Sequence, residues 1–381
     1  MFSKNISISI IFLGLILFFI LGCKNDNSIN KYDKLPSLAL LDSIIIDLPG
    51  AKFADYRKDM MLFYNSNSFE VLVYDKLNNK TINFNKHGNA PDEYDNITGK
   101  NLYFINDSIF GISSNHSIQL YNISGEYQKK INVNNISISP VSNFKFINDT
   151  AFFYVKIPEG NTSDFTYYSD LKKILAFENT QTLKHRLFID FPSDITELFD
   201  EQGYFPYIYD HHFNVLNKDL ISYLNSNGNT IYFYKKKGKD FILDNTVPLD
   251  LEYYERIKYK YNSFIDMEES IFQTFGSPII FGNYFYGDFI FTIYKQGFER
   301  EYIRNFAEEN VEFPYFIRPE ANYYINTMKD GIKYSSDILI DKKYGIPVYI
   351  NNDNVFTQKY PESKSERTGK TIFYKLRLEF K

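Results

Sequence analysis

One short segment of the sequence combines residue types that could bind a metal or transfer a proton. Asp210, His211 and His212 are consecutive, and they follow an aromatic-rich stretch that contains Tyr207 and Tyr209. Imidazole and carboxylate groups are frequent metal ligands, and histidine is the commonest general acid or base. Adjacent side chains on an extended chain point to opposite faces, however, so this stretch alone cannot direct both imidazoles at one metal. A structural role for the histidines is the simpler interpretation, and no metal site is predicted.

Aromatic side chains form the second class of candidate binding groups. Tyr207, Tyr209 and Tyr254 fall in stretches predicted to be loops or an insertion, where an exposed ring can stack on a sugar or a peptide. The chain is rich in such residues, with 33 Tyr and 37 Phe but no Trp. A β-rich core also uses many aromatic residues. Core packing is therefore the alternative explanation for each of them.

No motif in the sequence specifies an enzyme or a bound cofactor. Phosphate-binding glycine loops, dinucleotide fingerprints, HExxH zinc motifs, EF-hand loops and GxSxG elbows are all missing. The SxxK pattern at residues 169–172 has no companion motifs. No catalytic residue and no cofactor are predicted, and binding fits the sequence better than catalysis. A formal charge of −5 excludes the basic footprint that a nucleic-acid partner would need.

The amino terminus carries the most specific signal in the chain. Lys4 precedes an apolar run over residues 6–21, which Gly22 and Cys23, the only cysteine, follow. The run is short for a membrane-spanning helix and typical of a signal-peptide core. Residues 20–23 resemble the bacterial lipobox, in which the signal is cut before a cysteine that receives lipid. The alternative is an uncleaved anchor with an incidental cysteine.

This signal predicts three regions and a location. We expect a signal peptide at residues 1–22, a lipid-anchored tether at residues 23–35 and a folded domain at residues 36–381. Lipid on Cys23 would hold the protein at the cell envelope, and we expect the outer membrane. Whether the domain faces the periplasm or the cell surface stays open.

A unit of four short strands recurs along the folded domain. Residues 102–133 contain four apolar runs with period-two alternation, separated by Asn, Asp and Gly residues that favour turns. Such a unit is typical of one blade of a β-propeller. An apolar run that ends in an aromatic residue recurs at residues 71–74, 118–121, 174–177, 231–234 and 291–294, with a degenerate copy at 338–341. Six copies predict an all-β, six-bladed propeller.

Two further features complete the predicted architecture. Apolar segments near both chain ends, at residues 38–48 and 371–380, are expected to pair in one blade and to remove its open edge. Residues 251–275 break the strand rhythm, because aromatic and aliphatic residues recur there at spacings of three and four between charged ones. That spacing predicts a short amphipathic helical insertion. Residues 299–318 mix arginine and glutamate and are interpreted as a solvated face, and the sixth blade is expected to begin near Tyr323.

The signal, the repeats and the segment at residues 87–94 together resemble an uncharacterised family of six-bladed β-propeller lipoproteins of Bacteroidota. Many of those proteins carry a Gly-x-Gly-Pro-x-Glu-aromatic segment after the first blade. Gly88, Pro91, Glu93 and Tyr94 match it here, whereas Ala90 replaces the second glycine. The resemblance implies the fold and the envelope location and carries over no catalytic residue. Glu93 is expected to cap nearby backbone amides.

Together these features predict a lipid-anchored envelope propeller that binds a ligand or a protein partner. The membrane is the expected partner of Cys23, and the other partner is an unidentified small ligand, glycan or envelope protein. The candidate binding residues are Asp210, His211, His212, Tyr207, Tyr209 and Tyr254. Two alternatives stay open: a propeller enzyme acting on glycan or peptide, and a structural subunit of an envelope complex.

Overall fold

The computed structural model describes residues 36–97, 101–114, 117–132, 144–148, 151–155, 173–179, 184–190, 192, 211–226, 228–254, 276, 278–309, 321–359 and 369–380. The predicted signal peptide, the tether and Cys23 lie outside these residues. So do Tyr207, Tyr209, Asp210 and nearly all of the predicted helical insertion. Among the described residues, no helix has the length and apolar character needed to cross a membrane.

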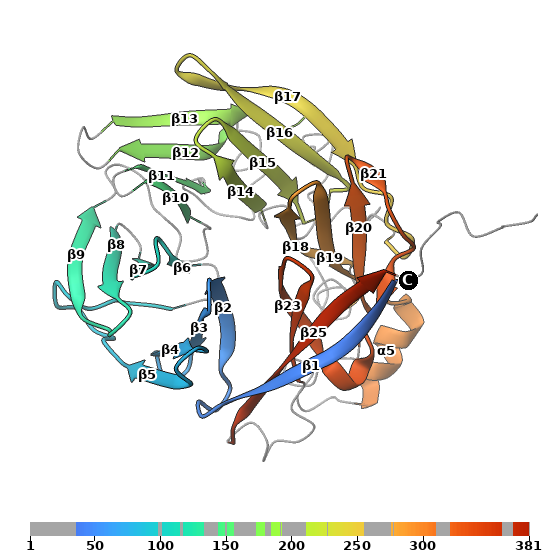
Figure 1. The fold of residues 1–381 in the computed structure, drawn as a ribbon, viewed down its shortest axis with the longest axis horizontal. Helices are drawn as coiled ribbons and strands as arrows, with labels where there is room; N and C mark the ends of the chain where they lie inside the picture. Colours follow the sequence, from blue (N-terminus) through green and yellow to red (C-terminus); the bar gives the residue numbers. More distant parts are fainter. Residues whose placement is uncertain are drawn as a thin grey trace, which may run out of the picture.

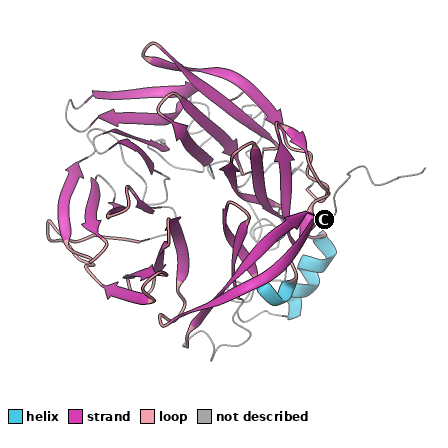
Figure 2. Cartoon of the chain, in the orientation of Figure 1, coloured by secondary structure: helices cyan, strands magenta, loops and turns pink. Residues whose placement is uncertain are grey.

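The described strands form six antiparallel sheets that follow one another in chain order around a central axis (Figure 1). Figure 2 shows that nearly all of the regular structure is strand. The predicted all-β propeller is therefore confirmed. In the first five sheets the chain begins next to the axis and moves outward, and in the sixth β23 lines the centre while β1 forms the outer edge.

The first three sheets are contiguous in sequence. The first contains β2 (Lys52–Arg57), β3 (Met60–Asn65), β4 (Glu70–Asp75) and β5 (Lys80–Phe84). The second contains β6 (Leu102–Phe104), β7 (Ile109–Ser114), β8 (Ser117–Asn122) and β9 (Tyr127–Asn132). The third contains β10 (Phe144–Asn148), β11 (Ala151–Val155), β12 (Lys173–Asn179) and β13 (Lys184–Asp190).

The other three sheets complete the ring. The fourth contains β14 (His211–Asn217), β15 (Leu220–Asn225), β16 (Thr230–Lys237) and β17 (Asp240–Pro248). The fifth contains β18 (Ile279–Tyr286), β19 (Phe289–Lys295), β20 (Tyr323–Lys329) and β21 (Ile332–Lys333), and β22 (Ile338–Leu339) also pairs with β20. The 3-10 helix η2 (Lys342–Tyr344) follows it. The sixth contains β23 (Ile346–Asn351), β24 (Asn354–Gln358), β25 (Thr371–Phe380) and β1 (Pro36–Ile46).

The two ends of the described chain close the ring, as the sequence predicts. β1 pairs antiparallel with β25 from Pro36↔Phe380 to Ile46↔Thr371. The Thr371 hydroxyl also donates to the Leu48 carbonyl at 3.0 Å and accepts the Ala51 amide at 3.1 Å. Because β25 lies between β1 and β24, the sixth sheet contains strands from both ends of the domain. This arrangement ties the ends together and leaves the ring without a free gap.

The repeat pattern locates most hairpins correctly and fails in the fifth sheet. The fifth copy, residues 291–294, lies in β19, the second strand of its sheet, whereas the earlier copies lie in third strands. The degenerate copy at residues 338–341 is not part of the sixth sheet, because β22 pairs with β20. The prediction that the sixth blade begins near Tyr323 is wrong for the same reason. Tyr323 opens β20, and the sixth sheet starts at Ile346.

A helix in the connection between two strands of the fifth sheet explains why the start of the sixth blade was misplaced. α5 (Arg300–Glu309) lies between β19 and β20, in a stretch that the sequence suggests is only a solvated face. Ile303 is buried, while Glu301, Tyr302 and Arg304 are exposed, so the helix is amphipathic. The ring of Phe298 stacks on Tyr302 with centroids 5.1 Å apart. Residues 296–322 separate β19 from β20, whereas only residues 287 and 288 separate β18 from β19, and this long interruption hides the repeat.

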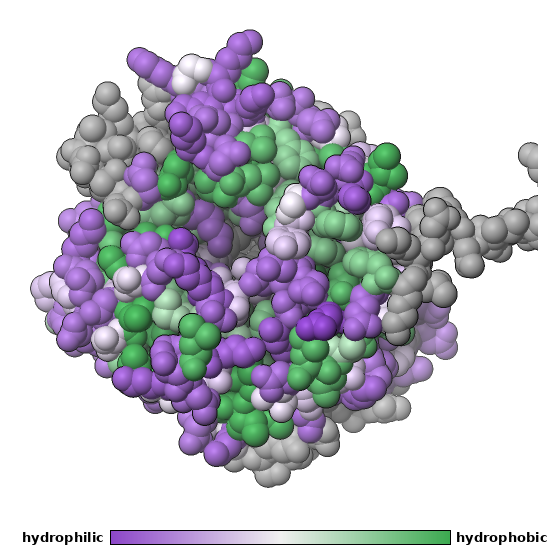
Figure 3. Space-filling view, in the orientation of Figure 1, coloured by the Kyte–Doolittle hydropathy of each residue, from purple (hydrophilic) through white to green (hydrophobic). Residues whose placement is uncertain are grey.

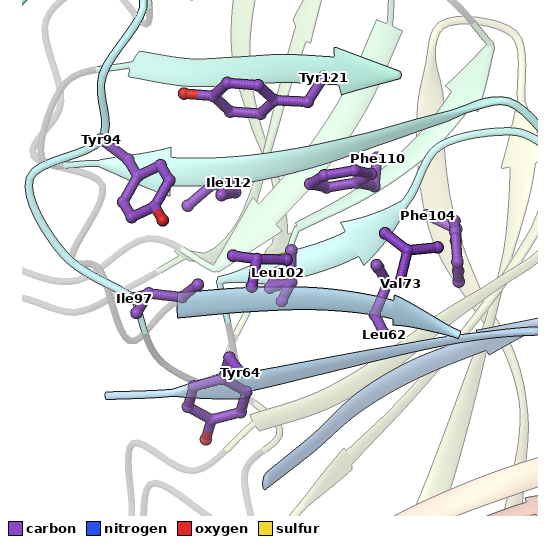
Figure 4. Close-up of a cluster of buried hydrophobic side chains, with 11 residues drawn as sticks. Leu62, Tyr64, Val73, Tyr94, Ile97, Leu102, Phe104, Phe110, Ile112 and Tyr121 are labelled. Atoms are coloured by element: carbon purple, nitrogen blue, oxygen red, sulfur yellow. The ribbon is translucent and has the colours of Figure 1, made fainter. Parts of the chain in front are cut away.

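Apolar side chains fill the space between neighbouring sheets. Figure 4 shows the cluster between the first and second sheets, in which Leu62 and Val73 face Leu102 and Phe104. Such layers exclude water from the inter-sheet space and provide the main stabilisation of the ring. Comparable clusters join the fifth to the sixth sheet and the sixth to the first.

The segment that resembles the lipoprotein family connects the first and second sheets. The Glu93 carboxylate accepts the Ala90 amide at 2.8 Å, as the sequence predicts. A Cβ at Gly88 would lie 2.0 Å from that carboxylate, so a larger residue there would displace the Glu93 side chain from this position. The fully buried Tyr94 donates its hydroxyl hydrogen to the Phe69 carbonyl at 2.6 Å. These contacts give the segment a structural role.

Candidate functional site

A cavity of about 200 Å³ lies at the centre of the ring. The innermost strand of every sheet contributes to the cavity wall. The lining residues come from β2, β6, β10, β14, β18 and β23. Figure 3 shows a hollow near the centre of the ring on the face drawn there. The lining residues are Phe53, Ala54, Asp55, Tyr103, Lys145, His212, Phe213, Asn214, Phe281, Gly282, Asn283, Tyr284, Val348 and Tyr349.

Asp55 is the carboxylate of this wall and is held by two backbone amides. Its Oδ1 accepts the Tyr56 amide at 2.9 Å, and its Oδ2 accepts the Phe104 amide at 2.8 Å. These bonds fix the side chain between the first and second sheets. Burial nevertheless raises the pKa of Asp55 above its ordinary 3.8, although the Lys145 charge and the two amides act in the opposite direction. The carboxyl group is therefore easier to protonate than an exposed aspartate.

Lys145 supplies the positive charge of the same wall from β10. Its Nζ lies 3.9 Å from the centroid of the Tyr103 ring, a cation–π contact. Among the described residues it makes no hydrogen bond or ion pair, and the Asp55 charge acts on it only through space. Burial lowers the pKa of Lys145, and the nearby Asp55 charge counteracts part of that effect. The cavity thus holds two opposite charges that do not touch.

Tyrosine rings surround the two charges. Burial raises the pKa of Tyr103, Tyr284 and Tyr349, and the charge of Asp55 adds to the effect on each. Their hydroxyl groups therefore stay protonated at neutral pH. The Tyr284 hydroxyl donates to the Val348 carbonyl at 3.3 Å, and its ring meets Tyr349 edge-on at 5.1 Å. The wall around the charges is consequently aromatic and rigid.

Polar groups from the fourth and fifth sheets form the opposite part of the wall. The Asn214 amide donates to the Asn283 side-chain oxygen at 3.1 Å. Asn283 is 3% exposed, and its own Nδ2 has no hydrogen-bond partner within the described structure. A buried donor without a partner costs free energy, so a ligand or water that accepts from it would be stabilising.

The two predicted histidines separate, as expected for neighbours on a strand. His212 lines the cavity, and its Nε2 lies 2.7 Å from the Ser226 hydroxyl and 3.0 Å from the Ile280 carbonyl. Because a carbonyl only accepts, Nε2 carries a hydrogen. His211 is buried on the other face of β14, with Nδ1 2.8 Å from the Tyr223 hydroxyl. Only His212 therefore belongs to the candidate site.

Tyr254 is the remaining predicted residue that the structure describes, and it does not reach the cavity. Its hydroxyl donates to the Ser226 carbonyl at 3.0 Å, and its ring packs edge-on against Tyr294 at 6.1 Å. It therefore braces the fourth sheet against the fifth. Tyr207, Tyr209 and Asp210 fall outside the described residues, as does Cys23, so these predictions stand untested.

Sequence reasoning missed Asp55 and Lys145. Asp55 lies between Ala54 and Tyr56 in β2, and Lys145 lies between Phe144 and Phe146 in β10. A charged residue is costly to bury and calls for a partner. This signal is available in the sequence, but only the ring brings the two strands to one cavity. Among the described residues, no group of three or more His, Cys, Asp or Glu could hold a metal.

A second buried charged cluster joins the fourth and fifth sheets away from the axis. Asp337 accepts hydrogen bonds from the Asn326 amide at 2.8 Å, from the Glu252 backbone at 2.8 Å and from the Tyr294 hydroxyl. Lys333 lies 3.1 Å from Asp337 and 2.9 Å from Glu252. Burial lowers the pKa of Lys333, but the Glu252 hydrogen bond and the Asp337 charge outweigh it and raise that pKa. The charges here satisfy one another.

Comparisons with known proteins show the fold. A solved structure of a DUF4221 family member from Bacteroides vulgatus superposes with a TM-score of 0.63 at 12% identity, covering 92% of this chain and 99% of that one. An exported protein from Bacteroides fragilis gives a TM-score of 0.49 at 10% identity, covering 93% and 98%. No protein-family model and no curated protein matches the chain. The first superposition confirms a propeller over almost the whole length of both chains.

Proposed function

We propose that this protein is a binding protein of the cell envelope that takes a small polar ligand in its central cavity. One observation carries the proposal. The innermost strands of all the described sheets meet at a cavity whose wall holds one carboxylate, Asp55, and one ammonium group, Lys145, that do not pair with each other. Buried charges normally find partners within the protein, so charges left open to a cavity indicate a binding site.

We also propose that the ring has six blades, one for each sheet. Every sheet contributes its innermost strand to the cavity wall, and the sheets follow one another without a gap in the strand order. Each of the first five sheets contains a copy of the sequence repeat, whereas the sixth sheet contains none. The number of blades sets the size of the cavity, because the central space of a propeller is bounded by one strand from each blade.

The composition of the wall favours binding over catalysis. Among its residues, Asp55 is the sole carboxylate and His212 the sole imidazole, and His212 is already engaged by Ser226 and Ile280. Hydrolysis of a glycan commonly uses two carboxylates that flank the bond. The described cavity does not contain such a pair. The enzyme alternative would therefore need residues that lie outside the described part of the chain.

Lipid on Cys23 remains our proposal for how the protein reaches the envelope. In this proposal residues 23–35 are the tether that joins the lipid to the folded domain. Replacing Cys23 with serine should release the protein from the membrane fraction without changing its melting temperature. Incorporation of a radiolabelled fatty acid into the unmodified chain alone would support the anchor. A serine variant that still sediments with outer membranes would contradict it.

The binding proposal is tested by a thermal-shift screen of the full chain in detergent. The probes are monosaccharides, amino acids, short peptides and divalent cations. A ligand at a hundredfold excess over its Kd adds about 2.7 kcal/mol to stability, which gives a measurable shift. We expect at least one class to raise the melting temperature, and the shift to disappear in Lys145→Met. A shift that persists in this variant and in Asp55→Asn would locate binding elsewhere and overturn the proposal.

A further inference from the structure

The proposed binding function leaves the class of ligand undefined, and the charges on the cavity wall narrow it. Asp55 belongs to the first sheet and Lys145 to the third, with Tyr103 of the second sheet between them in chain order. Each charge influences the other through space, yet no ion pair joins them among the described residues. The two charges therefore border a common space from different strands.

Both charges have bonding capacity left over. A carboxylate offers about four lone-pair sites. Asp55 uses two of them for the amides of Tyr56 and Phe104. An ammonium group has three donors. Lys145 makes only its contact with the Tyr103 ring within the described structure.

The charge balance of the wall restricts what can enter. One carboxylate and one ammonium group give the wall a net charge near zero. A ligand with a net charge would leave one buried charge facing a like charge, which is costly. A ligand that carries both signs pairs with each group and keeps the site neutral. A cavity of about 200 Å³ with aromatic walls suits a molecule with a short hydrocarbon spacer.

From this juxtaposition, and resting on the proposed binding function, we propose that the cavity binds a small zwitterion. Its ammonium group lies at the Asp55 carboxylate and its carboxylate at Lys145. The rings of Tyr284 and Tyr349 border the ammonium end, where a cation–π contact adds to the ion pair. The partner class is an amino acid or a related short molecule with separate positive and negative ends.

The test is calorimetric titration of the full chain in detergent with a series of zwitterions of increasing length. Glycine, β-alanine and γ-aminobutyrate differ only in the spacing of the charges. The matched probes for β-alanine are propylamine, propionate and propionamide, which keep its three-carbon chain and remove one or both charges. Glucose serves as an uncharged polar probe. We expect one zwitterion length to bind best, about tenfold or more tighter than its matched probes.

Two variants then assign the ends of the ligand. Asp55→Asn should abolish the preference for the zwitterion over propionate, because the ammonium group loses its partner. Lys145→Met should abolish the preference over propylamine for the corresponding reason. Asp341→Asn is the control, since Asp341 pairs with Lys343 on the surface and lies away from the cavity. It should leave every affinity unchanged.

The outcomes separate this inference from the proposed function. Glucose or another uncharged probe that binds best, with binding lost in Lys145→Met, would overturn the zwitterion and keep the cavity as a binding site. Equal affinities for β-alanine and propionamide would overturn it in the same way. No binding by any probe, together with no shift in the wider screen, would overturn both proposals. Because the ligand series uses the unmodified chain, the result does not depend on the variants folding.

Discussion

Two charged clusters, one buried around Asp337 and one at the central cavity, differ in how their charges are satisfied. Around Asp337, every partner comes from the protein: Lys333, Asn326, Tyr294 and the Glu252 backbone all contact the carboxylate. Around the central axis, Asp55 and Lys145 lie at one cavity without pairing. A satisfied cluster holds sheets together, whereas an open one is available to a ligand. The difference teaches that burial of charge alone does not identify a site.

The largest expected effect is on the satisfied cluster. Asp337→Ala removes the acceptor shared by its partners and leaves Lys333, whose side chain is 5% exposed, with Glu252 as its remaining counter-charge. Breaking a buried pair in this way costs about 3–5 kcal/mol. Urea denaturation should show that loss. The surface pair of Asp341 and Lys343 gives the control, because both side chains are exposed and Asp341→Ala should cost much less than Asp337→Ala. Similar losses for both variants would remove the contrast.

A smaller effect tests a single hydrogen bond of the same cluster. Tyr294→Phe deletes the hydroxyl that donates to the Asp337 carboxylate, and a bond to a charged group contributes about 1.5–3 kcal/mol. Tyr324→Phe is the matched change, because its hydroxyl lies 3.3 Å from the neutral Gln296 side chain. That change should cost about 0.5–1.5 kcal/mol. Denaturant midpoints of the two variants are compared, with the same dependence of unfolding free energy on denaturant concentration used for both. A larger loss of stability in Tyr324→Phe than in Tyr294→Phe would contradict the prediction.

Removing the positive charge of Lys145 at the central cavity should change the stability of the protein much less. Lys145→Met keeps an unbranched side chain of nearly the same length and removes a charge that makes no ion pair among the described residues. Burial already disfavours this charge, so we expect stability to change by no more than about 1 kcal/mol. A loss as large as that of Asp337→Ala would mean that Lys145 is a structural residue. The same denaturation experiment decides between the two.

The smallest expected effect is a pH dependence at Asp55. Its pKa is raised above 3.8 in the folded protein, so the folded state holds this proton over a range where the unfolded state has lost it. Stability contributed by Asp55 therefore falls as pH rises from 3.8 through the raised pKa. Wild type should lose stability relative to Asp55→Asn over that range. A difference that changes in the opposite sense would show that the carboxylate is stabilised in its charged form.

Predictions from the sequence were correct where the pattern behind them spans only a few neighbouring residues. Strand–turn–strand repeats such as residues 104–110 and 146–152 are set by alternation and by turn residues, and they were placed correctly. Pairing of the chain ends followed from the need to close a sheet edge. The boundary of the sixth sheet was misplaced, because α5 separates β19 from β20 and no local pattern shows which strands pair across it.

The candidate site was found less well for a related reason. The Asp210–His212 segment attracted attention because its residues are adjacent, but adjacency on a strand separates side chains, and only His212 reaches the cavity. Asp55 and Lys145 are about ninety positions apart and belong to ordinary strand sequence. They meet at the central cavity only because the sheets close into a ring.

The sequence by itself determined the class of fold, the antiparallel hairpins and the closure of the ring, because period-two patterns and turn residues act over a few positions. The tertiary structure alone decided which charged residues share a cavity and which satisfy one another. Coulombic and desolvation effects depend on distances through space, and in a propeller those distances are set by the ring and not by separation along the chain.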